Sequence, residues 1–223
     1  MSIVSGRDSK LTLSLLKEIY MLEIKENRPG YRTFEYLLIL DPHEELRSRI
    51  LNIKKSFNDT YQIGQPQLGK PRISMVKFQQ LEMFEERIVQ RLNTVAMGHA
   101  PIKVELRDYG SFPSHTIFLK VISREPIRQL VREIKVAQRL MKLNDDHKPH
   151  FMEEPFIPIA MKLLPWQYEK AWTVFSNKHF TGRFIADGMM LLKRPHGAKG
   201  YQILRRFDFL NMPVATRQGE LFA

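Results

Sequence analysis

Two similar phrases in the chain hold residues whose side chains can contact an anion. Residues 71–75 read PRISM and residues 155–159 read PFIPI, so a frame of proline, variable residue, isoleucine and variable residue occurs twice. In a strand, side chains two residues apart point to the same side, so the two variable residues of each frame share a face. An arginine fork and a hydroxyl group both donate hydrogen bonds to phosphate oxygens. The first phrase therefore predicts a phosphate contact at Arg72 and Ser74; the alternatives are a surface arginine on an edge strand and a solvated strand serine.

A lysine follows each phrase. Lys77 lies five residues after Arg72, and Lys162 lies six residues after Phe156, the first variable residue of the second phrase. If the two phrases face one cleft, both ammonium groups lie near its mouth. The alternative is that both are solvated surface lysines, as most lysines are. We predict that the phosphate contacts are Arg72, Ser74, Lys77 and Lys162.

The chain is basic. Its 223 residues include 35 Lys and Arg against 24 Asp and Glu, which gives a formal net charge of +11. This surplus favours a polyanionic partner, either nucleic acid or a phosphorylated small molecule, and a solvated basic surface is the alternative. The sequence contains no cysteine, which excludes a disulfide framework, a thiolate metal site and a cysteine nucleophile.

The sequence carries no sign of membrane insertion or export. No apolar run approaches the roughly 20 residues that a membrane span needs. The start of the chain lacks the charged-then-apolar layout and the small-residue cleavage site of a secretory signal. We therefore expect an intracellular, cytoplasmic protein without membrane contact.

The hydrophobic pattern predicts the elements that position the two phrases. Strands are expected at 33–42, 72–78, 102–112 with a turn at Tyr109-Gly110, 115–121, 156–163, 180–195 and 200–210. Amphipathic helices are expected at 43–61, 80–98, 125–145 and 164–178. Because strands often follow one another directly, this order predicts an α+β fold with largely antiparallel sheets.

The repeated frame predicts two lobes. The two copies lie 84 residues apart, and a helix follows each of them. This spacing indicates two halves related by a pseudo-twofold axis, with the repeated strands facing each other across a central cleft and helices flanking the sheets. We expect one two-lobed domain at 31–212, an N-terminal extension at 1–30 and a C-terminal tail at 213–223.

Further phrases occur in the order of a known family. They are LLILDPHEELRSRI at 37–50, ELRDYGSFPSHTIFLKV at 105–121, PWQYEKAW at 165–172 and FTGRFIADGMMLLKRP at 180–195. With the two frames, they make the chain resemble the two-histidine (2H) phosphoesterase superfamily, the 2'-5' RNA ligase-like group. The resemblance spans about residues 33–210. In that family each frame carries histidine, any residue, then threonine or serine on a strand.

The resemblance implies a simple chemistry. One histidine removes a proton from the attacking oxygen, and the other donates a proton to the leaving oxygen. The two hydroxyl groups hydrogen-bond the phosphate oxygens and stabilise charge in the transition state. The family activity is that of a cyclic phosphodiesterase or 2'-5' RNA ligase, and the resemblance implies neither a metal nor a cofactor.

This chain departs from the family at the motif positions. Arg72 and Phe156 stand where the histidines are expected, and Ser74 and Pro158 stand where the hydroxyl residues are expected. Arginine stays protonated and cannot act as a base, and phenylalanine transfers no proton. Each lost acid–base group removes about 10²–10⁴-fold of rate. We therefore expect a catalytically degenerate protein that binds RNA ends or nucleotide phosphates in a basic cleft.

Two other functions stay open at this stage. The chain could be an active 2',3'-cyclic phosphodiesterase or RNA ligase that uses a displaced histidine, for which His150 and His115 are the candidates. It could also be a non-enzymatic regulatory module whose cleft recognises a phosphorylated ligand. Phe156 either stacks on a base or fills the cleft, and Pro158 predicts a strand that is bent or at a sheet edge.

The C-terminal tail holds a short motif. Residues Gln218 to Phe222 read QGELF, which resembles the peptide by which bacterial proteins bind the DNA sliding clamp. The alternative is a frayed tail, or one that docks on the protein's own surface.

Overall fold

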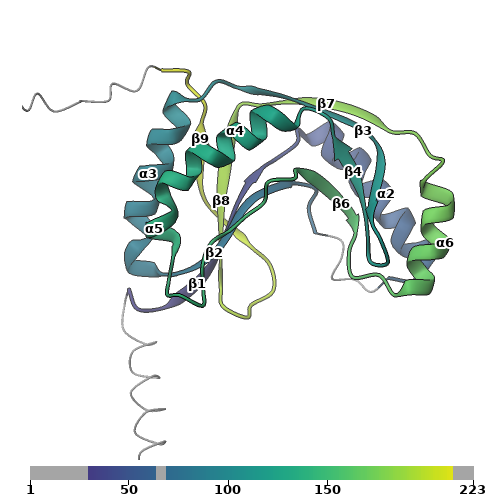
Figure 1. Ribbon diagram of the computed structural model, residues 1–223, viewed down its shortest axis with the longest axis horizontal. Helices are drawn as coiled ribbons and strands as arrows, with labels where there is room; N and C mark the ends of the chain where they lie inside the picture. Colours follow the sequence, from purple (N-terminus) through teal and green to yellow (C-terminus); the bar gives the residue numbers. More distant parts are fainter. Residues whose placement is uncertain (1–29, 64–68, 213–223) are drawn as a thin grey trace, which may run out of the picture.

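Two antiparallel sheets form the two legs of an arch (Figure 1). The computed structural model describes residues 30–63 and 69–212, so the predicted tail at 213–223, and all but Gly30 of the predicted extension at 1–30, lie outside the described residues. Helices cover the outer sides of both sheets. The α+β, two-lobed architecture predicted from the sequence is confirmed.

The first leg is a five-stranded sheet in the order β5-β2-β1-β8-β9. Its strands are β1 Thr33–Leu40, β2 Ile73–Leu81, β5 His150–Phe151, β8 Gly188–Pro195 and β9 Gln202–Asp208. Alternate residues of β1 face the core, where Tyr36, Leu38 and Leu40 are fully buried. Glu35 and its alternate neighbours point to the opposite face.

The second leg is a four-stranded sheet in the order β6-β4-β3-β7. Its strands are β3 Ile102–Phe112, β4 Thr116–Val121, β6 Phe156–Ala160 and β7 Thr181–Ala186. The strand that carries Pro158 is therefore an edge strand, as the proline predicts, because proline has no N–H to donate to a ladder on both sides.

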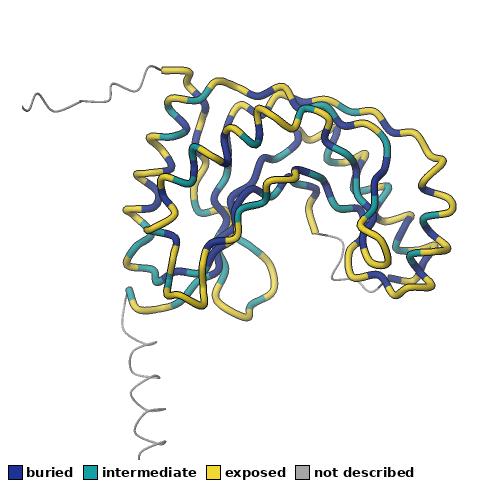
Figure 2. Tube along the Cα trace, viewed as in Figure 1, coloured by how far each residue is buried: buried dark blue, intermediate teal, exposed yellow. Residues whose placement is uncertain are grey.

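Each sheet has its own helices. The helices are α2 Glu44–Tyr61, α3 Glu85–Gly98, α4 Arg124–Ile134, α5 Gln138–Met141 and α6 Pro165–Phe175, with 3-10 turns η2 Glu82–Phe84 and η3 Lys135–Ala137. Helices α3 and α5 contact the five-stranded sheet, whereas α2 and α6 contact the four-stranded sheet. Buried residues follow the strands of both legs (Figure 2), and one apolar core is continuous between them.

Three local predictions were wrong. The strand expected at 180–195 breaks at Asp187, and its halves, β7 and β8, belong to different sheets. The turn expected at Tyr109-Gly110 is absent: β3 runs through it, with a bulge at Asp108, whose φ is 56°.

The helix expected at 125–145 ends early, because the Asn144 side chain accepts hydrogen bonds from the backbone N–H groups of the residues after it.

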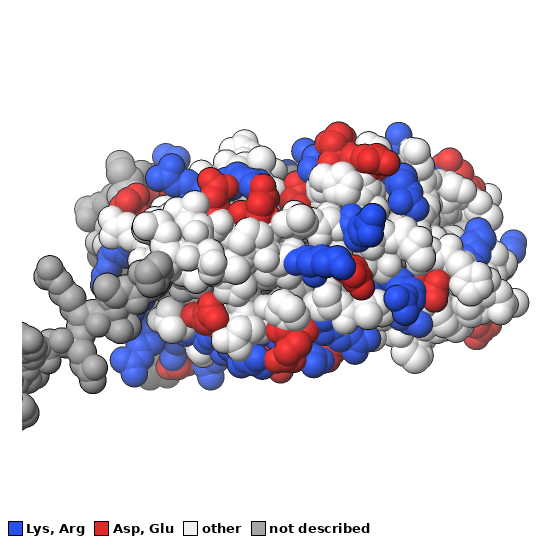
Figure 3. All heavy atoms as spheres, turned by 90° about the horizontal axis from the view of Figure 1, so that it is seen from above, with Lys and Arg blue, Asp and Glu red and all other residues white. Residues whose placement is uncertain are grey.

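No helix in the described ranges is both long enough and apolar enough to cross a lipid bilayer. The face seen from above in Figure 3 carries basic and acidic side chains interspersed over its whole length. The positive charge of the chain is therefore not gathered on that face.

Candidate functional site

The two repeated phrases place their variable residues on the side of each strand that faces away from the core. In β2, Ile73 and Met75 are fully buried, whereas Ser74 between them and Arg72 before them are only partly buried. Strand β6 repeats this pattern, with Ile157 buried in the core. Strands β2 and β6 contact each other where the two sheets meet. The period-2 alternation of the two phrases thus aims their variable residues at the space between the legs.

A cavity of about 370 Å³ lies where the two phrases meet. Arg72 and Ser74 line it from the first phrase, and Pro158 lines it from the second. Its other lining residues are Leu37, Lys54, Gly69, Lys70, Ile159, Ala160, Met161 and Lys162. Three of the four predicted motif positions, and Lys162 of the two predicted lysines, therefore share one cavity.

A second cavity, of about 510 Å³, adjoins the first along the five-stranded sheet. Arg72, Lys70 and Gly69 line both cavities. Its lining combines the apolar or aromatic residues Ile39, Met190, Leu192, Tyr201 and Ile203 with the charged residues Asp41, Arg47 and Arg194. The two cavities thus adjoin at the cations Lys70 and Arg72, and the second offers apolar as well as charged side chains.

Arg72 is held at the junction of the two cavities by an aromatic ring. Its guanidinium carbon lies 5.4 Å from the centre of the Tyr201 ring, and the guanidinium carbon of Arg194 lies 4.5 Å from that centre. Burial lowers the pKa of Arg72, and this effect is opposed by Tyr201 and Asp41. An arginine remains a cation after such a change. Arg72 is therefore a fixed positive charge facing the cavity.

Lys54 also lines the first cavity, although it is not among the residues predicted from the sequence. It belongs to the buried stripe of α2, between Ile50 and Phe57, and is 5% exposed. Its Nζ donates a hydrogen bond of 2.6 Å to the carbonyl oxygen of Gly69. Burial, together with the positive charge of Arg72, lowers the pKa of Lys54 to about 8. The signal was present in the sequence, because a lysine four residues after Ile50 interrupts an apolar helical face.

Glu35 forms ion pairs with other cations on this side of the five-stranded sheet. Its carboxylate is 2.5 Å from Nη2 of Arg194 and 3.6 Å from Nζ of Lys77. The Tyr201 hydroxyl donates to it at 3.4 Å. Burial acts to raise the pKa of Glu35, but Arg194 and Lys77 outweigh it and lower that pKa. Lys77, predicted as a phosphate contact, therefore has a carboxylate partner and is absent from the lining of both cavities.

Phe156 lies in an aromatic cluster beside the cavity and is not part of its lining. Its ring centre is 5.3 Å from that of Phe112 and 5.0 Å from that of Phe118. Phe118 pairs with Pro158 in the ladder between β4 and β6. Of the two sequence interpretations, the contacts favour a residue that packs within the wall of the cleft.

The two candidate substitute histidines lie outside both cavities. His150 pairs with Lys77 in β5, at the edge of the five-stranded sheet, and is exposed. His115 is in the turn before β4, where its Nδ1 lies 2.6 Å from the hydroxyl of Thr116. The described residues contain no group of three or more His, Asp or Glu side chains arranged to hold a metal ion.

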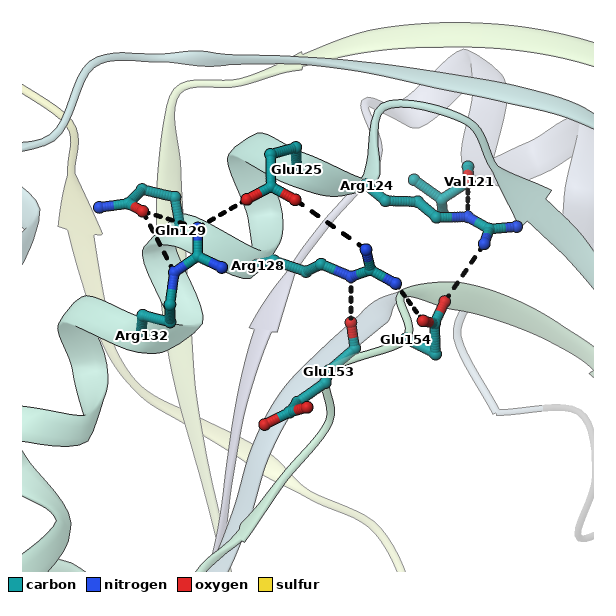
Figure 4. Close-up of polar contacts among 8 residues, drawn as sticks. All are labelled: Val121, Arg124, Glu125, Arg128, Gln129, Arg132, Glu153 and Glu154. Carbon is teal, nitrogen blue, oxygen red and sulfur yellow. Dashed lines mark hydrogen bonds and ion pairs between the residues drawn. The ribbon is translucent and has the colours of Figure 1, made fainter.

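Ion pairs hold the segment that leads into β6 against α4 (Figure 4). The Nε of Arg128 donates to the carbonyl oxygen of Glu153 at 3.2 Å, and its Nη2 pairs with the Glu154 carboxylate. Arg124 pairs with the same carboxylate at 3.4 Å. Because Glu153 and Glu154 directly precede the second phrase, these contacts set the start of the strand that carries Pro158.

Comparison with known proteins agrees with this geometry. The profile of the 2'-5' RNA ligase superfamily matches residues 43–198. Fold and sequence together define the chain as a member of the 2H phosphoesterases, and it belongs to the 2'-5' RNA ligase superfamily. No curated protein matches the sequence.

Solved structures of the same fold include bacterial proteins. E. coli LigT complexed with 3'-AMP has a TM-score of 0.56 and 13% identity, with 80% of this chain and 98% of that chain covered. TT0787 of Thermus thermophilus has a TM-score of 0.51 and 13% identity, with 79% and 98% covered. E. coli LigT complexed with ATP has a TM-score of 0.53 and 14% identity, with 79% and 98% covered. At these identities the likeness establishes the fold.

Proposed function

We propose that this protein binds the phosphate of RNA ends or nucleotides in the cleft between its two sheets, and that it has lost the acid–base chemistry of its superfamily. The observation that carries the proposal is the meeting of Arg72 and Ser74 with Pro158 around one cavity of about 370 Å³. The guanidinium fork and the hydroxyl group are donors suited to phosphate oxygens. The cavity therefore keeps binding groups at the family's motif positions.

Loss of turnover follows from the same residues. The guanidinium of Arg72 is already protonated and can neither accept a proton nor readily release one, and Phe156 has no ionisable proton, so the motif positions supply neither a base nor an acid. His150 and His115 lie outside the two cavities, which gives no support to a displaced histidine.

Nucleotide ligands suit the size and polarity of the site. The neighbouring cavity of about 510 Å³ has apolar and aromatic residues, among them Leu192 and Tyr201, in its lining beside Arg72, and these suit a sugar or base while the phosphate contacts the cations. E. coli LigT, which shares the fold, is known in complexes with 3'-AMP and ATP. A regulatory role, in which ligand binding changes a partner's state, is compatible with the same cleft.

Turnover of a nucleoside 2',3'-cyclic phosphate tests the catalytic half of the proposal. The natural protein is compared with a variant that carries Arg72→His, Phe156→His and Pro158→Thr. We expect no turnover by the natural protein and measurable turnover by the variant. Rapid turnover by the natural protein would show that another residue acts as the base, and His150→Ala and His115→Ala would then be measured first.

Binding of a labelled single-stranded RNA with a 3'-phosphate tests the other half. Fluorescence polarisation at increasing salt should show an affinity that falls as salt rises, because cations that contact phosphate release counterions. An affinity that does not change with salt would contradict an electrostatic contact in the cleft.

A further inference from the structure

Two cations withdrawn from water face the same cavity. Lys54 is 5% exposed, and its ammonium donates to a single backbone carbonyl. Arg72 is partly buried and stacks against Tyr201. Among the residues that the structure describes, neither forms an ion pair with a carboxylate. Lys54, whose pKa is about 8, still carries its charge at neutral pH.

The nearby carboxylates are already paired. Asp41 lies beside Arg72 in the lining of the larger cavity, but it accepts a hydrogen bond of 2.9 Å from Nη2 of Arg47. Glu35 is paired with Arg194 and Lys77. The cavity that Lys54 and Arg72 share is therefore left with an excess of positive charge, to which Lys70 and Lys162 in its lining add.

Buried cations without a counter-charge are unfavourable, and proteins pair them or place an anion against them. An anion with two negative charges would neutralise both cations together. A phosphate monoester carries a charge of about −1.5 to −2 at neutral pH, whereas a cyclic or internal phosphodiester carries a single negative charge. The monoester also offers three terminal oxygens to donors that surround it.

We propose that Lys54 and Arg72 form a dianion site that makes the cleft selective for the phosphate monoester at the end of a nucleotide or RNA over a cyclic phosphodiester. Ser74 lines the same cavity and supplies a further donor to the phosphate. The inference rests on the proposed function, since it names which phosphate the cleft holds. It adds a specificity residue, Lys54, that lies outside the two motif phrases.

The test compares two ligands that share base and sugar. Isothermal titration calorimetry is performed on the full chain with adenosine 3'-monophosphate and with adenosine 2',3'-cyclic monophosphate, and the cyclic compound is checked by chromatography to be intact afterwards. We expect the monoester to bind about tenfold more tightly than the cyclic diester, the size of one charged hydrogen bond.

Lys54→Met and Lys55→Met are the matched variants. Both remove one lysine from α2, but Lys55 is exposed to solvent, so its loss changes the net charge without changing the cavity. We expect Lys54→Met to lower the affinity for the monoester by about tenfold and to abolish most of the preference. Lys55→Met should keep both affinities. Thermal unfolding of each variant verifies that it is folded, and Lys54→Gln provides a polar replacement if the methionine variant does not fold.

The outcomes separate this inference from the proposed function. Equal affinity for the two ligands in the natural protein would overturn the dianion site while leaving phosphate binding intact. An equal loss of affinity for both ligands in Lys54→Met would show that Lys54 only positions the Gly69 backbone, and would also overturn it. Failure of either ligand to bind the natural protein would overturn the proposed function itself.

Discussion

The ammonium of Lys54, on a helix of one lobe, and the guanidinium of Arg72, just before a strand of the other, line one cavity, where the charge of Arg72 helps to lower the pKa of Lys54. Helix α2 packs on the four-stranded sheet, whereas β2, which Arg72 directly precedes, belongs to the five-stranded sheet. The two side chains thus bring one cation from each lobe to the proposed phosphate site. It also makes the stability of the protein depend on the protonation of one lysine.

Lys54 should destabilise the fold at neutral pH. Its pKa is lowered from 10.5 to about 8 in the folded state, so the unfolded chain binds more protons than the folded protein between these two pH values. Stability contributed by this group therefore rises as pH increases from about 8 to 10.5, and the penalty is fully present below about 8. A shift of one pKa unit corresponds to about 1.4 kcal/mol. The shift of Lys54 from 10.5 to about 8 therefore changes the free energy of unfolding by about 3 kcal/mol over this pH range.

The measurement is the difference in unfolding free energy between the natural protein and Lys54→Met across this pH range. Using the difference cancels other lysines and tyrosines that titrate in both proteins. We expect Lys54→Met to be the more stable protein at pH 8 and to lose that advantage by pH 10.5. A difference that stays constant with pH would contradict a buried, charged Lys54.

Arg72→Gln should weaken binding of a nucleoside 3'-monophosphate by about tenfold or more, because a charged hydrogen bond to phosphate contributes about 1.5–3 kcal/mol. The control is Arg91→Gln, which removes an exposed arginine from α3. Calorimetric titration of both variants at one salt concentration gives the comparison. Equal affinities in the two variants would place the phosphate elsewhere.

Gly110→Ala should destabilise the second leg. Gly110 lies opposite Phe118 in the β3–β4 ladder, and a Cβ there would come within 2.6 Å of Cε2 of that ring. Moving the ring disturbs its contacts with Phe112 and Phe156, at a cost of about 1–3 kcal/mol. Chemical denaturation measures the change. Gly69→Ala is the control, since a Cβ at Gly69 meets no atom within 4 Å.

The ion pair between Arg128 and Glu154 should contribute little to global stability. The two side chains are 34% and 56% exposed, and exposed pairs contribute about 0–1 kcal/mol. A double-mutant cycle with Arg128→Gln and Glu154→Gln measures the coupling energy. We expect it to vanish near 1 M salt, where the Debye length is about 3 Å. Coupling that persists at high salt would indicate a pair shielded from solvent.

The repeated frame correctly predicted which face of each strand its variable residues occupy, because strand periodicity is a local property. Alternation alone placed Arg72 and Ser74 on the face away from the core, and the proline of the second frame marked an edge strand. Lys54 was missed for a physical reason. A single lysine in an apolar helical stripe usually extends its ammonium into solvent, whereas here α2 packs against β6 and the ammonium of Lys54 donates to the carbonyl of Gly69.

The partner of Lys77 could not be read from the sequence either. Glu35 lies 42 residues before Lys77, and the β1–β2 pairing brings the two strands together. Arg194, which shares the same carboxylate, comes from β8 on the other side of β1. Such a contact depends on sheet order, which is a property of the whole chain. The division of the predicted strand at 180–195 between two sheets likewise depends on sheet order.

The passage of β7 into β8 across the single residue Asp187 has a consequence for the kinetics of recognition. One apolar core runs through both sheets, and the chain crosses between them without a linker, so we expect the walls of the cleft to be preformed before any ligand arrives. A preformed groove loses little conformational entropy when it is filled. Encounter rates should then be similar for ligands of similar size and charge, and selectivity among them should be expressed as residence time.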